Sequence, residues 1–301
     1  MGYYDIIRYF AEEHEIDVNA RDNKGCSVLI KAVEFGYSDI AQYLAGTCNA
    51  NVNDSDCVGC TALMKAAELG YRDIVCFLAR KCGAQVNARA ADRTTALIKA
   101  AEFGHLEIVR CLVEECRADF NVITIVGYTA ITKSAIRGHE NVVRYFVEQC
   151  EADVNAIAKG GSALILAAQN GQIDVVRYLA EQYKADINAT ATDGCTALIK
   201  AARYGRLDVI RYLVEEWNAN ANDISNDGYT AMMKAAQYGY IRVVRYLAYK
   251  RNANVATTAG DGYATVARLG EKSRGNIDVV RYLATVRGFN VMPSLVTDIR
   301  H

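Results

Sequence analysis

The sequence has no run of about 18 apolar residues, the length that a membrane-spanning helix needs, so it predicts no segment that crosses a membrane. The net charge is also close to zero, because 34 lysines and arginines stand against 35 aspartates and glutamates. The overall charge therefore gives no reason to expect nucleic-acid binding. Residues 1–6 lack an apolar secretory core, and Ile6 stands where a myristoylation signal has Ser or Thr. With 51% apolar and 23% charged residues, the composition is that of a folded, soluble protein.

Proline is nearly absent, since Pro293 is the only one, whereas there are ten cysteines. A secreted disulfide scaffold would be shorter and denser in cysteine. Cys57 and Cys60 have the CxxC spacing, but a structural zinc site takes four ligands, and no second CxxC or HxxxH accompanies them. We therefore expect free thiols in a reducing, cytoplasmic compartment, with no metal and no cofactor.

A repeat of 34 residues organises the chain, with one interval of 33. The copies read SVLIKAVEFG from Ser27, TALMKAAELG from Thr61, TALIKAAEFG from Thr95, TAITKSAIRG from Thr129, SALILAAQNG from Ser162, TALIKAARYG from Thr196 and TAMMKAAQYG from Thr230, and a degraded copy begins near Ala264. Each copy continues into a second apolar segment and a linker like that at 152–156. One such unit cannot bury its apolar face alone, so the copies must stack.

Each copy predicts two short helices. In the second copy Thr61 is a suitable N-cap, the paired alanines allow close helix approach, and Gly70 ends the helix. The second helix has one apolar stripe and usually opens with an acidic residue, which is favourable against the helix dipole. The stripe of this copy consists of Ile74, Val75, Leu78 and Cys82.

The repeat resembles the ankyrin repeat, on the segments 127–129 (Gly-Tyr-Thr), 104–109 (Gly-His-Leu-Glu-Ile-Val) and 152–156 (Ala-Asp-Val-Asn-Ala). Two departures stand out. The family's Thr-Pro-Leu-His has become Thr-Ala-Leu-Ile or Thr-Ala-Leu-Met, which accounts for the missing prolines. The period exceeds the usual one of about 33 residues, and the extra residue falls after the second helix, in 112–117.

The resemblance implies an all-α ankyrin-repeat solenoid of stacked helix–turn–helix units with β-turn fingers. We expect an ankyrin repeat domain over residues 1–290, with a half-repeat at its start and about eight repeats of 34 residues, the last one degenerate. Residues 291–301 are expected to form a C-terminal tail. Either the chain is a piece of a longer protein or the half-repeat serves as a cap.

By the same resemblance, a partner would bind the fingers and the first, inner helix of each repeat on a concave face. A lysine ladder follows these helices, and its first three members have a glutamate at i+3 that neutralises them. In the second half the glutamate becomes Ile136, Arg203 or Gln237, and tyrosines follow. This basic stretch suits either an acidic partner or plain solvation, while Asp193, Asp227 and Asp261 are expected to serve Asp-Gly turns.

One finger has an unusual polarity. Residues 122–128 read Val-Ile-Thr-Ile-Val-Gly-Tyr, whereas the other fingers are mainly polar. These apolar residues either cover the edge of the neighbouring finger, where Ile157 would meet them, or anchor a partner. The candidate partner-binding residues are Ile123, Ile125, Val126, Tyr128, Lys133, Ile136, Lys200, Arg203, Tyr204, Tyr229, Lys234, Tyr238 and Tyr263.

Three further ladders suggest structural roles. Arg110, Arg144, Arg177 and Arg211 each precede a glutamate by four residues, the arrangement of solvated pairs on the outer helix. Cys48, Cys82, Cys116 and Cys150 recur at a spacing too wide for disulfides and are expected to be small apolar residues at helix ends. His105 and His139 occupy the family's Gly-His position and are expected to be structural.

No GxSxG, GxxxxGK, HExxH or GxGxxG motif occurs, so the sequence does not predict an enzyme. The leading hypothesis is a monomeric protein–protein interaction module or scaffold. Two alternatives remain open: the targeting part of a larger regulator, such as a kinase or ubiquitin-ligase adaptor whose effector lies outside this chain, and a linker to cytoskeletal or membrane proteins.

Overall fold

The computed structural model describes residues 8–9, 17–158, 160–183, 185–250, 278–279 and 281–282. The chain divides into two compact units, residues 1–152 and 153–301. In the part that the structure describes, each unit is built from two-helix repeats joined by turns, with isolated β-bridges in place of strands. The predicted all-α repeat fold is confirmed.

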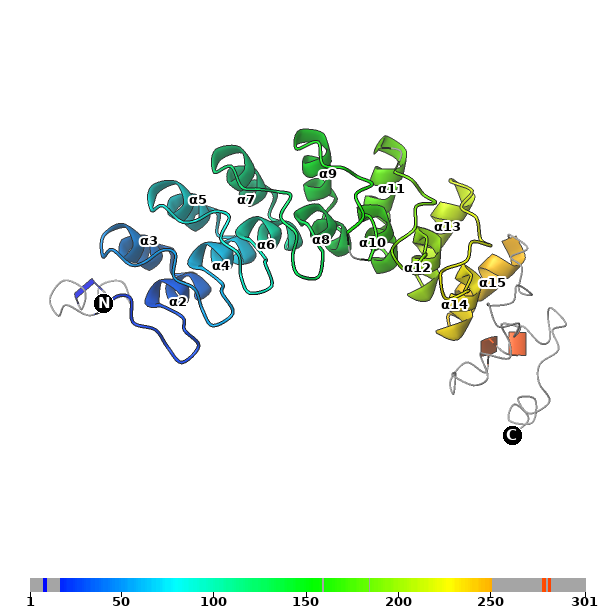
Figure 1. Cartoon of the computed structure of the whole chain (residues 1–301), viewed down its shortest axis with the longest axis horizontal. Coiled ribbons are helices and arrows are strands. Elements are labelled where there is room, and N and C mark those ends of the chain that lie inside the picture. The colour runs from blue at the N-terminus through cyan, green and yellow to red at the C-terminus, as the bar shows by residue number, and fades with distance from the viewer. Residues whose placement is uncertain are drawn as a thin grey trace. The chain divides into compact units, whose positions relative to one another are not determined.

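In both units the helices lie in two rows (Figure 1). The inner row of the first unit comprises α2 (Val28–Glu34), α4 (Ala62–Leu69), α6 (Ala96–Glu102) and α8 (Ala130–Arg137). Its outer row comprises α3 (Ser38–Gly46), α5 (Arg72–Lys81), α7 (Leu106–Arg110), which runs into the π-helical turn η1 (Cys111–Glu115), and α9 (Glu140–Gln149). The turn fingers project from the inner row (Figure 1).

The second unit repeats this arrangement with six helices in its described part. Its inner row comprises α10 (Ala163–Asn170), α12 (Ala197–Arg203) and α14 (Ala231–Gln237). Its outer row comprises α11 (Ile173–Tyr183), α13 (Leu207–Glu215) and α15 (Ile241–Lys250).

Every inner helix begins at the predicted hydroxyl cap. In each described repeat the Ser or Thr oxygen accepts the backbone N–H three residues later, at 3.3 to 3.5 Å. Such a cap satisfies one of the N–H groups that a helix start leaves without a partner. The caps are Ser27, Thr61, Thr95, Thr129, Ser162, Thr196 and Thr230.

The core lies between the rows. Ala66 and Ala67 of α4 are fully buried, so inner helices of neighbouring repeats approach closely, as the paired alanines predict. The outer-helix stripe is confirmed for Ile74, Val75 and Leu78, whereas Cys82 at its end is only partly buried.

The two histidines link neighbouring repeats, which confirms their structural role. Nε2 of His105 lies 3.1 Å from the carbonyl oxygen of Glu68, and Nε2 of His139 lies 3.0 Å from that of Glu102. A helix leaves its last carbonyls without intrahelical partners, so each imidazole satisfies one of them in the preceding repeat.

A left-handed residue follows five of the outer helices, two or three positions after the last helical residue. The φ angle is positive at Asn49, Gly83, Arg117, Glu151 and Asn218, which are equivalent positions of the repeat. The next residue donates back into the helix, for example Ala84 N–H to Leu78 O at 3.1 Å. The chain thus leaves the outer helix through this closing turn, which at η1 follows a π-helical turn.

Several predicted features lie outside the described residues: the N-terminal half-repeat apart from 8–9, the degenerate copy near Ala264 apart from 278–279 and 281–282, the tail 291–301, Asp261 and Tyr263.

Candidate functional site

The apolar finger of the first unit is exposed at its tip. The exposed fractions are 55% for Ile123, 65% for Ile125 and 49% for Val126, while Val122 before them is buried. Ile157, in the second unit, is exposed as well. Within the first unit, the side chains of Ile123, Ile125 and Val126 therefore lie at the surface.

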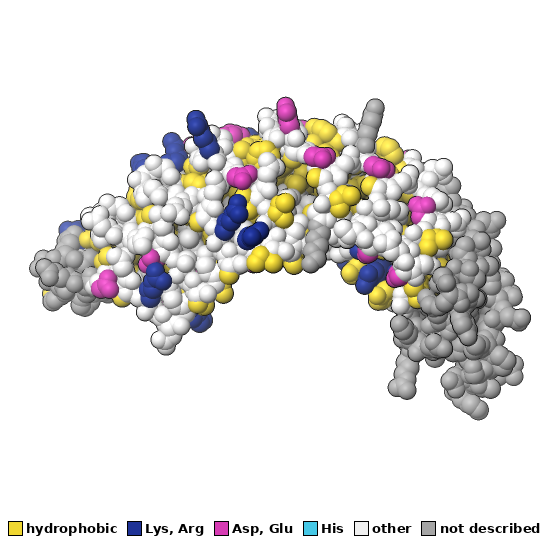
Figure 2. Space-filling model, in the orientation of Figure 1, with side chains coloured by type: hydrophobic (Ala, Val, Ile, Leu, Met, Phe, Trp, Pro, Cys, Tyr) yellow, Lys and Arg dark blue, Asp and Glu magenta, His cyan; other side chains and the backbone are white. Residues whose placement is uncertain are grey.

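The backbone of this finger is held in place. Thr124 N–H donates to Tyr128 O at 2.9 Å, and Gly127 N–H donates to Thr124 O at 2.8 Å, which closes the turn. Ile125 N–H donates to Asp92 O of the preceding finger, also at 2.9 Å. Figure 2 shows hydrophobic side chains at the surface along the edge of the first unit from which the fingers of Figure 1 project. The tip thus presents apolar side chains on a fixed backbone.

The lysines beside this finger are paired, partly with unexpected residues. Lys31 pairs with Glu34 at 2.8 Å, as predicted. However, Lys99 pairs with Glu68 of the preceding repeat at 3.3 Å, and Lys133 likewise with Glu102 at 3.2 Å. The prediction that Lys99 pairs with Glu102 of its own helix is therefore wrong, and Lys133, which was expected to lack a glutamate partner, has one. Both differences arise because the stacked helices bring glutamates of the preceding repeat within reach.

Tyr128 precedes and Ile136 follows Lys133 in the sequence, and the Tyr128 ring contacts the lysine. The ammonium of Lys133 lies 5.4 Å from the centroid of the Tyr128 ring, within the range of a cation–π contact. Ile136 is half-buried. The cation is therefore held between the Tyr128 ring and the carboxylate of Glu102.

The second-half lysines are buried, which corrects the expectation of an unpaired basic stretch. The side chains of Lys200 and Lys234 are only 8% and 6% exposed. Their ammonium groups contact finger aspartates, Asp193 at 2.7 Å and Asp227 at 2.5 Å. Burial would raise the pKa of Asp193, but the hydrogen bonds from Lys200 and Cys195, together with the charge of Lys200, outweigh it and lower that pKa. These aspartates thus hold lysines as well as shaping turns.

An exposed aromatic cluster remains on the second unit. The guanidinium of Arg203 lies 5.8 Å from the Tyr204 ring and 5.6 Å from the Tyr238 ring, and both tyrosines are exposed. Tyr229 instead lies against Lys234, at 4.2 Å from its ammonium. The structure therefore brings Arg203, Tyr204 and Tyr238 together.

The first unit also has a row of exposed apolar residues at equivalent positions that was not predicted from the sequence. Phe35, Leu69 and Phe103 occupy the position before the glycine that follows each inner helix, and all three are exposed. The signal was available in the aligned copies, which read Glu-Phe-Gly, Glu-Leu-Gly and Glu-Phe-Gly there. These residues lie at the opposite ends of the inner helices from the fingers.

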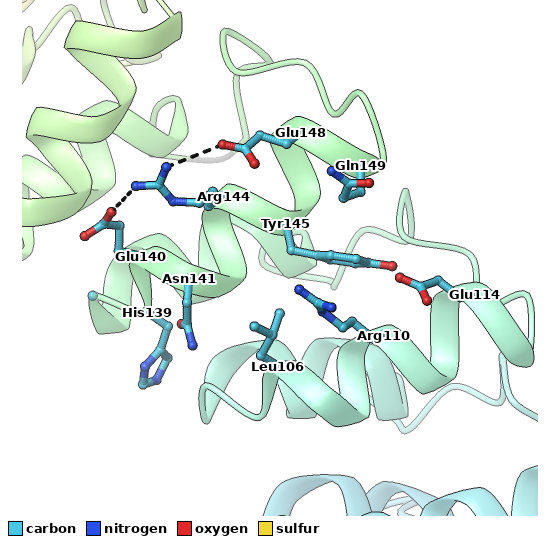
Figure 3. Close-up of a pocket in the computed structure, with 11 residues that line it drawn as sticks. Leu106, Arg110, Glu114, His139, Glu140, Asn141, Arg144, Tyr145, Glu148 and Gln149 are labelled. Atoms are coloured by element: carbon cyan, nitrogen blue, oxygen red, sulfur yellow. Dashed lines mark hydrogen bonds and ion pairs between the residues drawn. The ribbon is translucent and has the colours of Figure 1, made fainter.

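The arginines of the outer row lie on tyrosines of the next repeat. The guanidinium of Arg110 is 5.7 Å from the Tyr145 ring, and Figure 3 shows the Tyr145 hydroxyl pointing toward Glu114. Burial, aided by the hydrogen bond to Glu114, raises the pKa of Tyr145. Arg144, by contrast, pairs with Glu140 at 2.6 Å and with Glu148 at 3.5 Å. The predicted solvated arginine–glutamate pairing therefore holds for Arg144, whereas Arg110 lies on a tyrosine ring.

These residues line a surface groove of about 690 Å³ between α7 and α9 (Figure 3). Its charged groups contact one another: Arg144 bridges two glutamates, and Arg110 lies against Tyr145. Such a groove has the features of a contact between repeats more than those of a catalytic centre.

The second unit has the same contact. The guanidinium of Arg177 lies 5.0 Å from the Tyr212 ring, and the Tyr212 hydroxyl donates to Glu181 at 2.9 Å. The indole N–H of Trp217 donates to that hydroxyl at 2.8 Å. Burial and the hydrogen bond to Glu181 raise the pKa of Tyr212, whereas the bond from Trp217 opposes them.

Cys57 is exposed and Cys60 is buried. Among the described residues there is no group of three or more His, Cys, Asp or Glu side chains that could hold a metal ion. In the same part of the chain, no helix is both long and apolar enough to span a membrane.

Comparison with known proteins agrees with the fold. A search of curated proteins finds no match to the chain. A family model described as ankyrin repeats (3 copies) matches residues 1–90, 97–191 and 164–259. Ankyrin repeats are in general protein–protein interaction modules and are typically not enzymes. With matches over most of its length and the two-helix repeats described above, the chain belongs to the ankyrin repeat family.

Proposed function

We propose that this chain is a non-enzymatic protein-binding module whose partner docks on the first unit, across the apolar finger and the adjoining inner helices. The observation that carries the proposal is the exposure of Ile123, Ile125 and Val126 on a finger whose backbone is hydrogen-bonded at both sides. Exposed apolar groups on a fixed backbone gain hydrophobic free energy when a partner covers them and lose little conformational entropy.

The surface around the finger supports a protein partner. Lys99 pairs with Glu68, and Lys133 shares Glu102 with Arg137, so most of the charge at these positions on the inner-helix surface is paired. Phe35, Leu69 and Phe103 line its far margin. An apolar anchor, a balanced polar centre and a second apolar margin together suit a folded surface or an extended segment of a protein.

The cytoplasm is the compartment that we propose, on the basis of the ten free thiols. A monomer is proposed as well. The exposed cluster of Arg203, Tyr204 and Tyr238 is the next candidate surface if the finger does not bind.

The test replaces the tip with residues that the chain itself uses. In the preceding finger Ala91 and Asp92 are equivalent to Ile125 and Val126, so Ile125→Ala/Val126→Asp keeps a finger that the repeat tolerates. The matched control is Tyr249→Ser, which removes an exposed aromatic side chain from α15. Partners captured from cell extract by the parent chain are identified, and their affinity for each variant is then measured with purified components.

We expect the finger variant to lose at least about tenfold in affinity, since two exposed apolar side chains are removed from the proposed anchor. The control should bind like the parent chain. Equal binding by the finger variant and the parent would contradict the proposed site.

A further inference from the structure

Two cysteines of the outer row are in direct contact. Sγ of Cys76 in α5 lies 2.7 Å from Sγ of Cys111, the first residue of η1. This distance exceeds the disulfide bond length of about 2.05 Å, yet it is too short for an ordinary contact between non-bonded sulfur atoms. The cysteines predicted from the repeat, Cys48, Cys82, Cys116 and Cys150, occupy one equivalent position in successive repeats. The contacting pair is separated by 35 residues and so was not predicted.

The pair occupies a position that other repeats use to join outer helices. At four other junctions, residues equivalent to Cys76 and Cys111 form arginine–tyrosine contacts. These contacts are Arg110–Tyr145, Arg177–Tyr212, Arg211–Tyr246 and Arg245–Tyr282. At this junction both partners are cysteine, whereas the α3–α5 junction has Gln42 and Phe77 at the equivalent positions. The two thiols thus occupy a position of contact between repeats.

The surroundings hold the two thiols together. Arg80 of α5 pairs with Glu115 of η1 at 2.6 Å, which ties the same two elements beside the cysteines. The outer helix turns π-helical at Cys111, with Cys116 N–H donating to Cys111 O at 3.1 Å. π-Helical turns are rare and often mark functional positions.

We propose that Cys76 and Cys111 form a reversible oxidation site, at which a hydroperoxide converts the two thiols into a disulfide that staples neighbouring repeats. Cys76 is partly exposed and Cys111 is buried, so the peroxide reaches Cys76 first. The Cys76 thiol first gives its proton to water, and the thiolate then attacks one peroxide oxygen. The O–O bond breaks, a sulfenic acid forms, and the departing hydroxide or alkoxide takes up that proton from water and leaves as water or an alcohol.

The second step closes the disulfide. Sγ of Cys111 attacks Sγ of Cys76, the S–O bond breaks, and the departing hydroxide leaves as water with the proton of Cys111. In total, two thiols and one hydroperoxide give one disulfide and the reduced products of the peroxide. A thiol reductant reverses the change. Burial raises the pKa of the Cys111 thiol, which agrees with its role as the second rather than the first reactant.

Peptide mapping of the full chain tests the site. After treatment with hydrogen peroxide and alkylation of the remaining thiols, trypsin releases residues 73–80 with Cys76 and residues 111–117 with Cys111 and Cys116. Cleavage after Glu114 and Glu115 then separates Cys111 from Cys116. Trapping of sulfenic acid on exposed Cys57 with dimedone verifies that the oxidant has acted.

We expect a disulfide between Cys76 and Cys111 that dithiothreitol removes and that is absent from Cys76→Ser and Cys111→Ser. Absence of this link while Cys57 is oxidised would overturn the proposal. A link from Cys76 to Cys116 or Cys82 in its place would overturn it too.

A second variant keeps the junction but removes the chemistry. Cys76→Arg/Cys111→Tyr introduces the pair found at the four other junctions. We expect oxidation to raise the Tm of the parent chain by about 5 °C and to leave that of the variant unchanged. Equal shifts in both proteins would show that the stabilisation arises elsewhere and would contradict the staple.

Discussion

The guanidinium of Arg177 in α11 lies 5.0 Å from the centroid of the Tyr212 ring in α13, so a cation of one repeat rests on an aromatic ring of the next. The hydroxyl of the same tyrosine is held by Glu181 and Trp217. Neighbouring repeats are thus joined on their outer row by a contact that combines a cation–π interaction with hydrogen bonds.

A double-mutant cycle on Arg177→Ala and Tyr212→Ala measures this contact. We expect a coupling free energy of about 0.5–1 kcal/mol, the usual size for a partly exposed cation–π pair. Urea unfolding, followed by circular dichroism and by the fluorescence of Trp217, gives the free energies. If the effects of the two substitutions are additive, the Arg177 guanidinium and the Tyr212 ring lie side by side without stabilising each other.

The ion pair of Lys200 with Asp193 should stabilise the second unit. Asp193→Asn keeps an acceptor for the Cys195 N–H but leaves the buried Lys200 cation without its carboxylate, so we expect a loss of about 1–3 kcal/mol in the free energy of unfolding. The control is the double variant Asp193→Asn/Lys200→Leu, in which leucine replaces the lysine as Leu166 does at the equivalent position. The double variant should recover most of the loss, and a double variant as unstable as the single one would contradict the pairing.

The same pair predicts an acid dependence. The pKa of Asp193 is lower in the folded state than its ordinary value of about 3.9, so its stabilising contribution is present above that pH. The contribution is lost as the pH falls from about 4 toward the folded pKa. Unfolding of the parent chain and of Asp193→Asn should therefore converge in free energy below about pH 4.

His139 predicts a second, milder pH dependence. Burial lowers its pKa below 6.5 in the folded chain, although the hydrogen bond to the Glu102 carbonyl opposes this shift. Because the unfolded state then binds the proton more tightly, stability is complete above pH 6.5 and decreases as the pH falls below it. His139→Gln introduces the residue that Gln172 provides at the equivalent position, and it should remove this contribution of His139 to the pH dependence of stability. Parallel pH profiles for the two proteins between about pH 5 and 7 would argue against it.

At the left-handed position after the outer helices, we expect one substitution to raise the free energy of unfolding and a matched substitution in another repeat to lower it. Glu151 has a φ of 51°, so Glu151→Gly should stabilise the chain by up to about 1 kcal/mol. Gly83 has a φ of 70° at the equivalent position, and an added Cβ there would meet no atom within 4 Å. Gly83→Ala should therefore destabilise by about 1 kcal/mol through backbone strain alone. Thermal unfolding of both variants checks the signs, and a neutral Gly83→Ala would refute the strain argument.

Much of the fold follows from local patterns. The Ser and Thr caps, the paired alanines and the closing glycines depend on residues a few positions apart, and the repeat makes each pattern visible seven times in the described chain. The unusual polarity of the finger at 123–126 was likewise apparent, because no other copy has more than one branched aliphatic residue at these positions, namely Val58, Ile157 or Ile224.

The side-chain partners required the tertiary structure. From the sequence, Lys99 could pair with Glu102 in its own helix, but stacking brings Glu68 within 3.3 Å. Similarly, only the packed chain shows that Lys200 folds back onto its finger and that Cys76 reaches Cys111. The periodicity of the sequence thus determined the helices, their order and the family, because those depend on short-range propensity and on apolar spacing. Which charges pair, which thiols touch and which apolar side chains stay exposed was decided by packing between repeats, where residues 31 to 37 positions apart become neighbours.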